Sequence, residues 1–311
     1  MENEPAAYRE FGRFLGERYR KFANIMWTIG GDHDPQDRIS RLDALANGLK
    51  DANPEFILSA HTWENKSAMD QYGQFDWLDL NTVYTYFPEW NANTQVYALS
   101  LKEYGRRPEK PFVMIESGYE NGVTGEISVA PYQVRREAYW SILSGSTGFA
   151  YGNSDIWPFN PRWKVALDDP GAFYQMHAFH VFSSYRWFDL VPDQDHNIVI
   201  EGYGTFNQDT SPGGDEYITA AGTADGLLAI IYIPSTGTDS RAFYINMSCF
   251  SSSFVEAKWY NPTDGSSKPI GNFQCTERKQ LFTTPGDNGT STNDWLLTLT
   301  RAGATLNNKS I

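Results

Sequence analysis

Residues 111–120 read PFVMIESGYE, an apolar run that ends in the carboxyl side chain of Glu116. An apolar run of this length is typical of a buried strand. Helical patterns lie on both sides of it, at 93–104 and 132–143. This succession predicts a chain of β-α units, with a carboxylate where one of its strands ends.

The same alternation extends in both directions along the chain. Further strands are predicted at 24–32, 56–63, 77–87 and 148–153, and further helices at 6–21, 39–49 and 172–187. Five strands in strict β-then-α order fit either a (β/α)8 barrel or a doubly wound sheet. No strand is followed by GxGxxG or GxxxxGK[ST], the phosphate loops expected of a doubly wound nucleotide-binding protein. Polar residues gather at the strand ends, where barrels place their chemistry. We therefore predict an α/β fold that is part of a TIM (β/α)8 barrel and is three strands short.

Beyond residue 195 the helical period disappears and short apolar strands follow one another. They are predicted at 197–204, 216–223, 227–234, 241–248, 254–261 and 295–300. Asp225-Gly226 is a hairpin signal, and NPTDG at 261–265 is a turn cluster. This pattern predicts an antiparallel β-sandwich. The predicted domains are a partial barrel at 1–194 and a β-sandwich at 195–311.

Composition limits the classes of partner. The net charge of −13 argues against nucleic acid and against an anionic membrane, since both require basic side chains. No apolar run approaches the roughly 20 residues that span a bilayer, and the first residues carry no signal-peptide pattern. The aromatic share of 15% fits a carbohydrate cleft or simply a large aromatic core. Cys249 and Cys275 could form one disulfide, and no metal-ligand set or cofactor motif is evident.

Asp32 and Glu116 are the candidate catalytic residues. Hydrolysis of a glycosidic bond uses two carboxyl groups, one that protonates the leaving oxygen and one that attacks or stabilises the anomeric carbon. Each of the two follows a strongly apolar strand, as a barrel active site requires. Taken singly, Asp32 could instead cap the helix entered at Pro35, and Glu116 could pair with Arg135 or Arg136. Their joint position at strand ends favours the catalytic interpretation.

Other strand-end residues are candidate sugar contacts. They are His61, Tyr84, Tyr86, Glu120, Asn153 and Trp157. His61 is equally compatible with a hydrogen-bonded structural histidine. Glu120 could orient Tyr119 or pair with an arginine, and Trp157 could either stack on a sugar ring or pack its own loop.

Several of these motifs resemble one known family. NIMWTIGGDHD at 24–34 is similar to the fourth-strand signature of the apiosidase-like glycoside hydrolases, family 140 and its relatives. PFVMIESGYE resembles the seventh-strand motif, with Ser117-Gly118 where many members carry Glu-Pro. AYWSILSGSTGFAYGN at 138–153 resembles the last helix and eighth strand. The C-terminal segment resembles the module, named for collagen binding, that follows these barrels.

The resemblance implies a retaining glycosidase with Asp32 as acid/base and Glu116 as nucleophile. The two carboxyl groups are then expected about 5–5.5 Å apart. It further implies a plant polysaccharide substrate, no cofactor, and an extracellular full-length protein. Because the match begins in the helix before strand four, we expect the chain alone to be inactive or poorly folded. A non-catalytic carbohydrate- or matrix-binding protein is the alternative.

Overall fold

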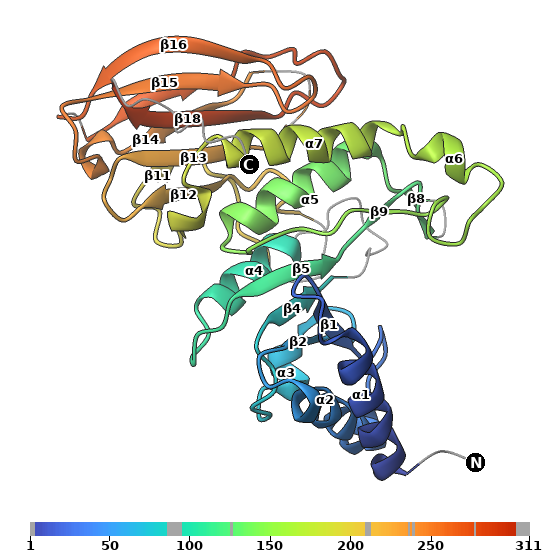
Figure 1. Cartoon of the computed structure of the whole chain (residues 1–311). Coiled ribbons are helices and arrows are strands. Elements are labelled where there is room, and N and C mark those ends of the chain that lie inside the picture. The colour runs from blue at the N-terminus through green and yellow to red at the C-terminus, as the bar shows by residue number, and fades with distance from the viewer. Residues whose placement is uncertain are drawn as a thin grey trace.

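Helices and parallel strands alternate in the N-terminal half of the computed structural model, as the sequence predicts (Figure 1). The structure describes residues 4–85, 95–124, 127–208, 213–235, 237, 240–276 and 278–302. The helices of this half are α1 (Pro5–Tyr19), η1 (Gln36–Arg38), α2 (Ile39–Ala52), α3 (Ala68–Tyr72), α4 (Gln95–Tyr104), α5 (Pro131–Leu143), α6 (Trp163–Ala166), α7 (Pro170–Ser183) and η2 (Trp187–Asp189). The strands are β1 (Met26–Ile29), β2 (Ile57–Ala60), β3 (Lys66–Ser67), β4 (Asn81–Tyr84), β5 (Phe112–Glu116), β6 (Tyr119–Glu120), β7 (Val123–Thr124), β8 (Ile127–Ser128) and β9 (Gly152–Asn153).

The parallel strands lie side by side in the order in which the chain forms them. β1 pairs with β2, β4 with β5, and β6 with β9. The amide of Leu80 donates to the carbonyl of Leu58 (3.1 Å), which brings β4 next to β2. The amide of Ala150 donates to the carbonyl of Met114 (2.9 Å), so the segment before β9 lies beside β5. The described parallel strands therefore follow one another in space without a reversal of order.

The prediction that 24–32 is a buried strand is wrong for one of its faces. Met26 is 61% exposed and its partner Ile57 is 46% exposed. Trp27 and Leu58, on the opposite face, join the core formed with α1 and α2. Among the described residues β1 pairs only with β2, so the outer edge of β1 stays unpaired there, and Met26 and Ile57 remain exposed beside it.

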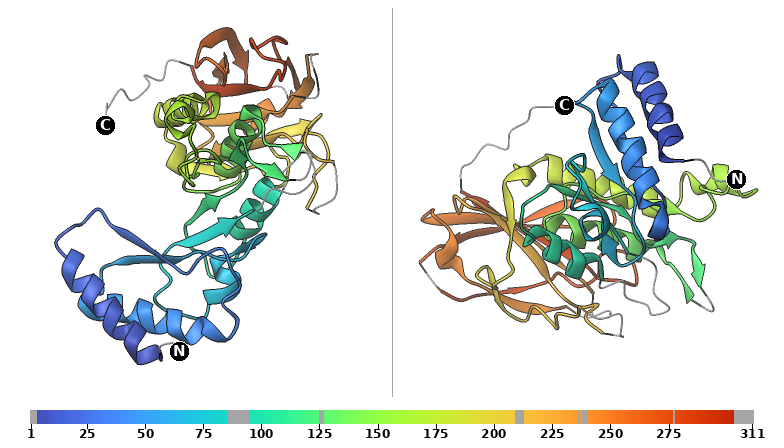
Figure 2. Two further views of the ribbon diagram at one scale, coloured as in Figure 1. Left: turned by 90° about the vertical axis from the view of Figure 1, so that its right-hand side faces the viewer. Right: turned by 90° about the horizontal axis from the view of Figure 1, so that it is seen from below.

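Helices α1 and α2 pack through glycine. A Cβ atom at Gly48 would lie 2.1 Å from the carbonyl oxygen of Arg9, and one at Gly12 would lie 2.3 Å from that of Leu45. Such separations leave no room for any side chain at the crossing. The helix pair forms the end of the molecule that is farthest from the C-terminal sheets (Figure 2).

All six strands predicted beyond residue 195 are present. The C-terminal elements are β10 (Leu190–Pro192), β11 (Val199–Glu201), β12 (Thr219–Thr223), β13 (Leu228–Ile233), β14 (Ala242–Ile245), η3 (Met247–Cys249), β15 (Phe254–Tyr260), β16 (Ser267–Gln274), β17 (Gln280–Thr283) and β18 (Trp295–Arg301). They form a six-stranded antiparallel sheet in the order β10-β12-β13-β18-β15-β16 and a three-stranded one in the order β11-β14-β17. Because β10 belongs to the larger sheet, that sheet begins ahead of the predicted boundary at residue 194. Cys249 and Cys275 are both free thiols.

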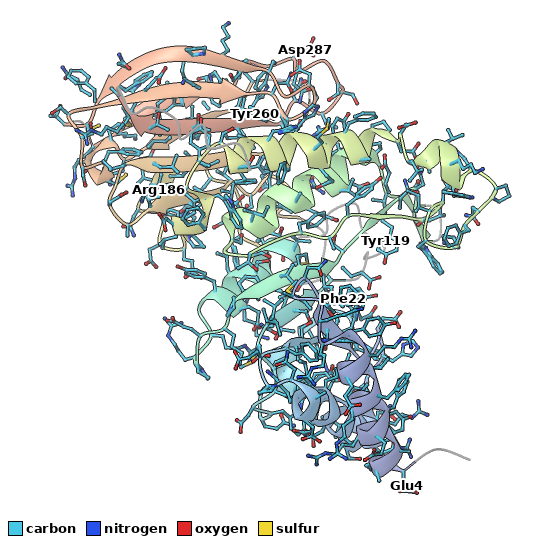
Figure 3. All side chains as sticks on the ribbon, viewed as in Figure 1. Glu4, Phe22, Tyr119, Arg186, Tyr260 and Asp287 are labelled. Atoms are coloured by element: carbon cyan, nitrogen blue, oxygen red, sulfur yellow. The ribbon has the colours of Figure 1, made fainter. Side chains whose placement is uncertain are left out.

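The central strands β12, β13 and β18 of the six-stranded sheet are buried on both faces. Along β13, Ile230 and Tyr232 belong to the core that contains residues of α4, α5 and α7, whereas Ile231 and Ile233 belong to the core shared with the three-stranded sheet. Side chains alternate across a strand, so one strand serves both cores. The hydroxyl of Tyr260 donates to a backbone carbonyl of α7 (2.9 Å), at the place where sheet and helix meet (Figure 3).

A buried ion pair joins α5 to the beginning of β18. Nη2 of Arg135 lies 2.6 Å from Oδ1 of Asp294, and the two side chains are 1% and 3% exposed. The hydroxyl of Tyr232 donates to the same carboxylate (2.8 Å). Burial alone would lower the pKa of Arg135, but the charge and hydrogen bonds of Asp294 raise it above its ordinary value. Arg135 therefore keeps its charge inside the protein.

Replacing Arg135 by Ala is expected to destabilise the fold by about 3–5 kcal/mol, because Asp294 would remain buried without its partner. Lys279→Ala is the matched control. It breaks the Lys279–Glu201 pair, which also joins two elements but is about half exposed. Exposed pairs contribute less than about 1 kcal/mol. Urea unfolding of both variants measures the difference, and equal losses would contradict the role given to Arg135.

Candidate active site

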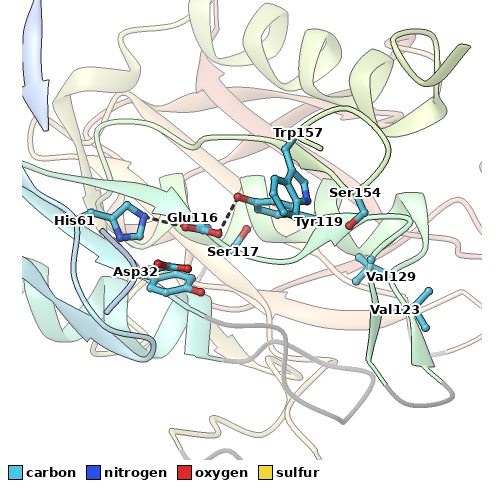
Figure 4. Close-up of a pocket in the computed structure, with 11 residues that line it drawn as sticks. Asp32, His61, Glu116, Ser117, Tyr119, Val123, Val129, Ser154 and Trp157 are labelled. Carbon is cyan, nitrogen blue, oxygen red and sulfur yellow. Dashed lines mark hydrogen bonds and ion pairs between the residues drawn. The ribbon is translucent and has the colours of Figure 1, made fainter. Parts of the chain in front are cut away.

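The carboxylate of Glu116 lies between two hydrogen-bonding side chains at the end of β5. The hydroxyl of Tyr119 donates to Oε1 (2.7 Å), and Nε2 of His61 lies 2.8 Å from Oε2. Figure 4 shows Glu116 between the two, with Asp32 on the side of His61. The Glu116 side chain is 21% exposed, so a substrate can still reach it. Among the described contacts, none joins Glu116 to Arg135 or Arg136, the two alternative partners. Arg135 is instead paired with Asp294.

The turn after β5 brings Tyr119 back to Glu116. Ser117 donates its hydroxyl to Oε2 of Glu137 (2.8 Å), a carboxylate that is buried on α5. A Cβ atom at Gly118 would lie 3.0 Å from the other oxygen of the same carboxylate. The Ser-Gly pair therefore fits closely over Glu137. β6 begins directly afterwards and pairs with β9.

His61 is fixed by its backbone and by both ring nitrogens. Its amide donates to the carbonyl of Ile29 (2.8 Å), so it extends the β1–β2 pairing by one residue. Nδ1 lies 3.1 Å from the carbonyl oxygen of Thr62. The ring also makes an edge contact with Tyr84, with centroids 5.2 Å apart. Tyr84 is 3% exposed and borders the same cavity.

Asp32 follows the glycine turn at the end of β1. Gly30 has φ +85°, and a Cβ there would lie 3.2 Å from the carbonyl of His61, so this turn favours glycine. The Asp32 side chain is 57% exposed, and its nearest ionic neighbour is His33 at 3.3 Å. Asp32 is not the helix cap that the sequence offered as an alternative, because the residues that precede η1 and α2 are Pro35 and Arg38.

Asp32 and Glu116 border a single cavity of about 500 Å³. Eleven residues line it: Asp32, His61, Tyr84, Glu116, Ser117, Tyr119, Gly122, Val123, Val129, Ser154 and Trp157. Trp157 is 67% exposed, which leaves its ring face available to a ligand. The cavity thus combines two carboxyl groups, hydroxyl groups and an aromatic face, the mixture that recognises a sugar ring and its hydroxyls.

Hydrogen bonding keeps Glu116 ionised. Burial would raise the pKa of its carboxyl group, but the hydrogen bonds from His61 and Tyr119 and the charge of His61 outweigh burial and lower it. Burial would likewise lower the pKa of His61, yet the hydrogen bond and charge of Glu116 raise it above its ordinary value. Burial and Glu116 also raise the pKa of Tyr119, so its hydroxyl stays protonated and keeps donating.

Two predicted sugar contacts lie outside the cavity. Glu120 is 1% exposed, accepts the amide hydrogen of Gly171 (3.1 Å) and bonds the hydroxyl of Tyr151. Asn153 is 3% exposed and donates to the carboxylate of Asp169 (3.1 Å). Strand β6 carries Glu120 on the side opposite to the cavity, because neighbouring side chains alternate and Tyr119 points inward. These contacts favour a structural role for Glu120 and Asn153.

The other predicted site residues either line the cavity or lie outside the described residues. The structure brings together Asp32, His61, Tyr84, Glu116 and Trp157. Tyr86 lies outside the described residues. Sequence reasoning missed the contact of Tyr119 with Glu116, although a tyrosine three residues after a strand-end carboxylate, across a Ser-Gly turn, was an available signal. Within the described part of the chain, no group of three His, Cys, Asp or Glu residues could hold a metal ion.

Comparison with known proteins decides the family. A family model described as "Apiosidase-like, catalytic domain" matches residues 2–189, more than half of the chain. The chain belongs to the apiosidase-like family. It is therefore a glycosidase by ancestry, and the family implies a carbohydrate substrate. A second model, described as "Putative collagen-binding domain of a collagenase", matches residues 205–300.

Solved structures agree with this apiosidase-like assignment at the level of fold. One, titled a glycoside hydrolase, has 23% identity and a TM-score of 0.85, with 97% of this chain and 70% of that chain covered. A family 5 glycoside hydrolase from Bacteroides vulgatus has 24% identity and a TM-score of 0.84, with 99% and 69% covered. No curated protein matches the sequence. Among the described helices of the apiosidase-like chain, none is long and apolar enough to cross a membrane.

The His61–Glu116 contact makes stability depend on pH. The raised pKa of His61 stabilises the fold below its ordinary value of 6.5, and this contribution is lost as pH rises through the raised value. The lowered pKa of Glu116 stabilises above its ordinary value of 4.5, and this contribution is lost as pH falls through the lowered value. The contact therefore contributes fully between about pH 4.5 and 6.5.

His61→Gln is expected to lower the urea midpoint more at about pH 5.5 than at about pH 9, since only the lower pH keeps the ion pair intact. His180→Gln is the matched control, because His180 is exposed on α7 and has no ion-pair partner among the described contacts. At about pH 5.5 it should lower the midpoint less than His61→Gln does. A loss in His61→Gln that does not change with pH would show that the two groups are not coupled.

Proposed function

We propose that this protein is a retaining glycosidase in which Glu116 is the nucleophile and Asp32 the acid/base. One observation carries the proposal: Glu116 is held ionised by two side-chain hydrogen bonds, and it borders the same cavity as Asp32. An ionised carboxylate can attack the anomeric carbon as the leaving oxygen departs.

The surroundings of the two carboxyl groups suit different tasks. Glu116 is oriented from both sides, which favours attack from a fixed position. Asp32 is 57% exposed and is not clamped by a second carboxylate or an arginine in the described contacts. After protonating the leaving group, it can take a proton from the water that hydrolyses the glycosyl ester of Glu116. A separation of about 5–5.5 Å between the two carboxyl groups remains a prediction of this mechanism.

We further propose that the parallel strands are strands four to eight of a (β/α)8 barrel. Two observations support this. The strands follow chain order without the reversal that a doubly wound sheet contains. Met26 and Ile57 are apolar on the face away from α1 and α2, where a closed barrel places its interior side chains.

Two exposed apolar faces support the same proposal. Phe11 and Phe14 on α1 are 53% and 55% exposed, and Phe173 and Phe179 on α7 are 46% and 63% exposed. α1 precedes β1, and α7 follows β9, so each helix borders one end of the strand series. Three further β-α units between these ends would cover both faces and pair the open edge of β1.

The substrate is proposed to be a plant polysaccharide or an oligosaccharide derived from it. The exposed ring of Trp157 at the cavity rim can stack on the apolar face of a sugar, while Ser154 can meet one of its hydroxyls. Substrates of this kind lie outside cells, so we propose an extracellular site of action for the full-length protein.

Asp32→Asn and Glu116→Gln are each expected to reduce kcat by about 10²–10⁴-fold or more in a protein whose barrel is complete, because each removes one half of the chemistry. Aryl glycosides of plant cell-wall sugars provide the assay. Glu120→Gln is the matched control, since Glu120 lies outside the cavity. Near-normal turnover by either carboxyl variant would refute the role assigned to that residue.

Residues 1–311 alone are expected to turn over substrate at least about 10²-fold more slowly than a fusion that supplies three N-terminal β-α units of an apiosidase-like barrel. Without the three N-terminal β-α units, part of the substrate is not held in position. A misplaced substrate can lower the rate by about 10²-fold. kcat/KM for the two proteins on the same aryl glycoside measures the effect. Equal values would count against the barrel proposal while leaving the carboxyl pair intact.

A further inference from the structure

The two ring nitrogens of His61 face two different kinds of acceptor. Nδ1 lies 3.1 Å from the backbone carbonyl of Thr62, and Nε2 lies 2.8 Å from Oε2 of Glu116. A carbonyl oxygen can only accept, so Nδ1 must carry a hydrogen. A neutral ring would then turn the bare lone pair of Nε2 toward the carboxylate. Only the doubly protonated ring satisfies both contacts when Glu116 is ionised.

We infer that His61 is a positioning residue, an imidazolium that keeps Glu116 ionised and aimed, with the hydrogen on its Nδ1 held by the carbonyl of Thr62. The inference rests on the proposed role of Glu116 as nucleophile. It goes beyond that role, because it assigns a fixed charge to a histidine that the two-carboxylate mechanism does not require.

Every described group around the ring agrees with a positive charge. Glu116 on β5 faces Nε2, and Asp32 after β1 favours the cation whenever Asp32 itself is ionised. Tyr84 on β4 presents its ring to the edge of the imidazole. Tyr119 donates to the other oxygen of Glu116 and so leaves Oε2 to His61. No lysine or arginine lies among the described residues that border the cavity.

The proton of His61 stays in place throughout the proposed reaction. In the first step an oxygen of Glu116 bonds to the anomeric carbon, the bond to the leaving oxygen breaks, and Asp32 supplies the proton to that oxygen. In the second step water attacks the same carbon, Asp32 takes its proton, and the bonding electron pair returns to Glu116. The imidazolium stabilises the carboxylate before the first step and as it departs in the second.

Titration of the imidazole nitrogens by long-range ¹H–¹⁵N NMR tests the inference without any substrate. The 311-residue chain has five histidines, and His61→Gln identifies the signal of His61 by its loss. In the unmodified chain both nitrogens of His61 should remain protonated above pH 6.5, its ordinary pKa. Glu116→Gln should move the midpoint down by about 1–3 pH units, the usual effect of losing an adjacent opposite charge.

Tyr119→Phe is the control, since it removes the other hydrogen bond to Glu116 but keeps the charge that faces His61. Its His61 midpoint should stay above 6.5. The carboxyl ¹³C signal of Glu116 gives a second readout, whose midpoint should rise in His61→Gln. A neutral His61 at pH 6.5, or an unchanged midpoint in Glu116→Gln, overturns the inference. Loss of the proposed glycosidase role would appear separately, as normal turnover in Glu116→Gln.

Discussion

The six-stranded C-terminal sheet, whose central strands are buried on both faces, is the constraint that positions the helices behind the candidate site. One face of β13 and β18 packs against α5 and α7, and the other packs against the three-stranded sheet. The buried Arg135–Asp294 pair fixes α5 against this sheet in one register. Glu137, two residues farther along α5, then receives the hydroxyl of Ser117, directly after Glu116. A continuous series of contacts thus runs from the C-terminal core to the candidate nucleophile. The C-terminal domain is therefore part of the support of the active site.

Much of this arrangement could be predicted from sequence, because it follows from local patterns. The apolar run before Glu116 marks a strand, and the alternation beyond residue 195 marks an antiparallel sheet. The carboxyl residues at strand ends indicate where chemistry gathers. Glu120 and Asn153 show the limit of such reasoning. Both also lie at strand ends, but sequence does not say which face of a two-residue strand points into the cavity. In the structure, both point into a buried network with Tyr151 and Asp169.

Other features depend on contacts between segments far apart in the chain. The exposure of Met26 follows from what lies beside β1, which its own residues do not encode. β16 was missed because its sequence is polar and contains Pro269 and Gly271, and its place at a sheet edge tolerates both. The hydrogen bond between His61 and Glu116 likewise joins residues 55 positions apart. Single-sequence patterns identify such side chains as candidates but do not pair them.

The central claim is that Glu116 attacks the sugar and carries it as a covalent intermediate. A 2-deoxy-2-fluoro glycoside with a good leaving group slows the second step more than the first, so the intermediate accumulates. We would treat a protein that carries residues 1–311 in a complete barrel with this reagent and map the modified peptide by mass spectrometry. The account predicts one added glycosyl group, on Glu116. A label on another residue, or no label while the parent glycoside is turned over, would contradict it.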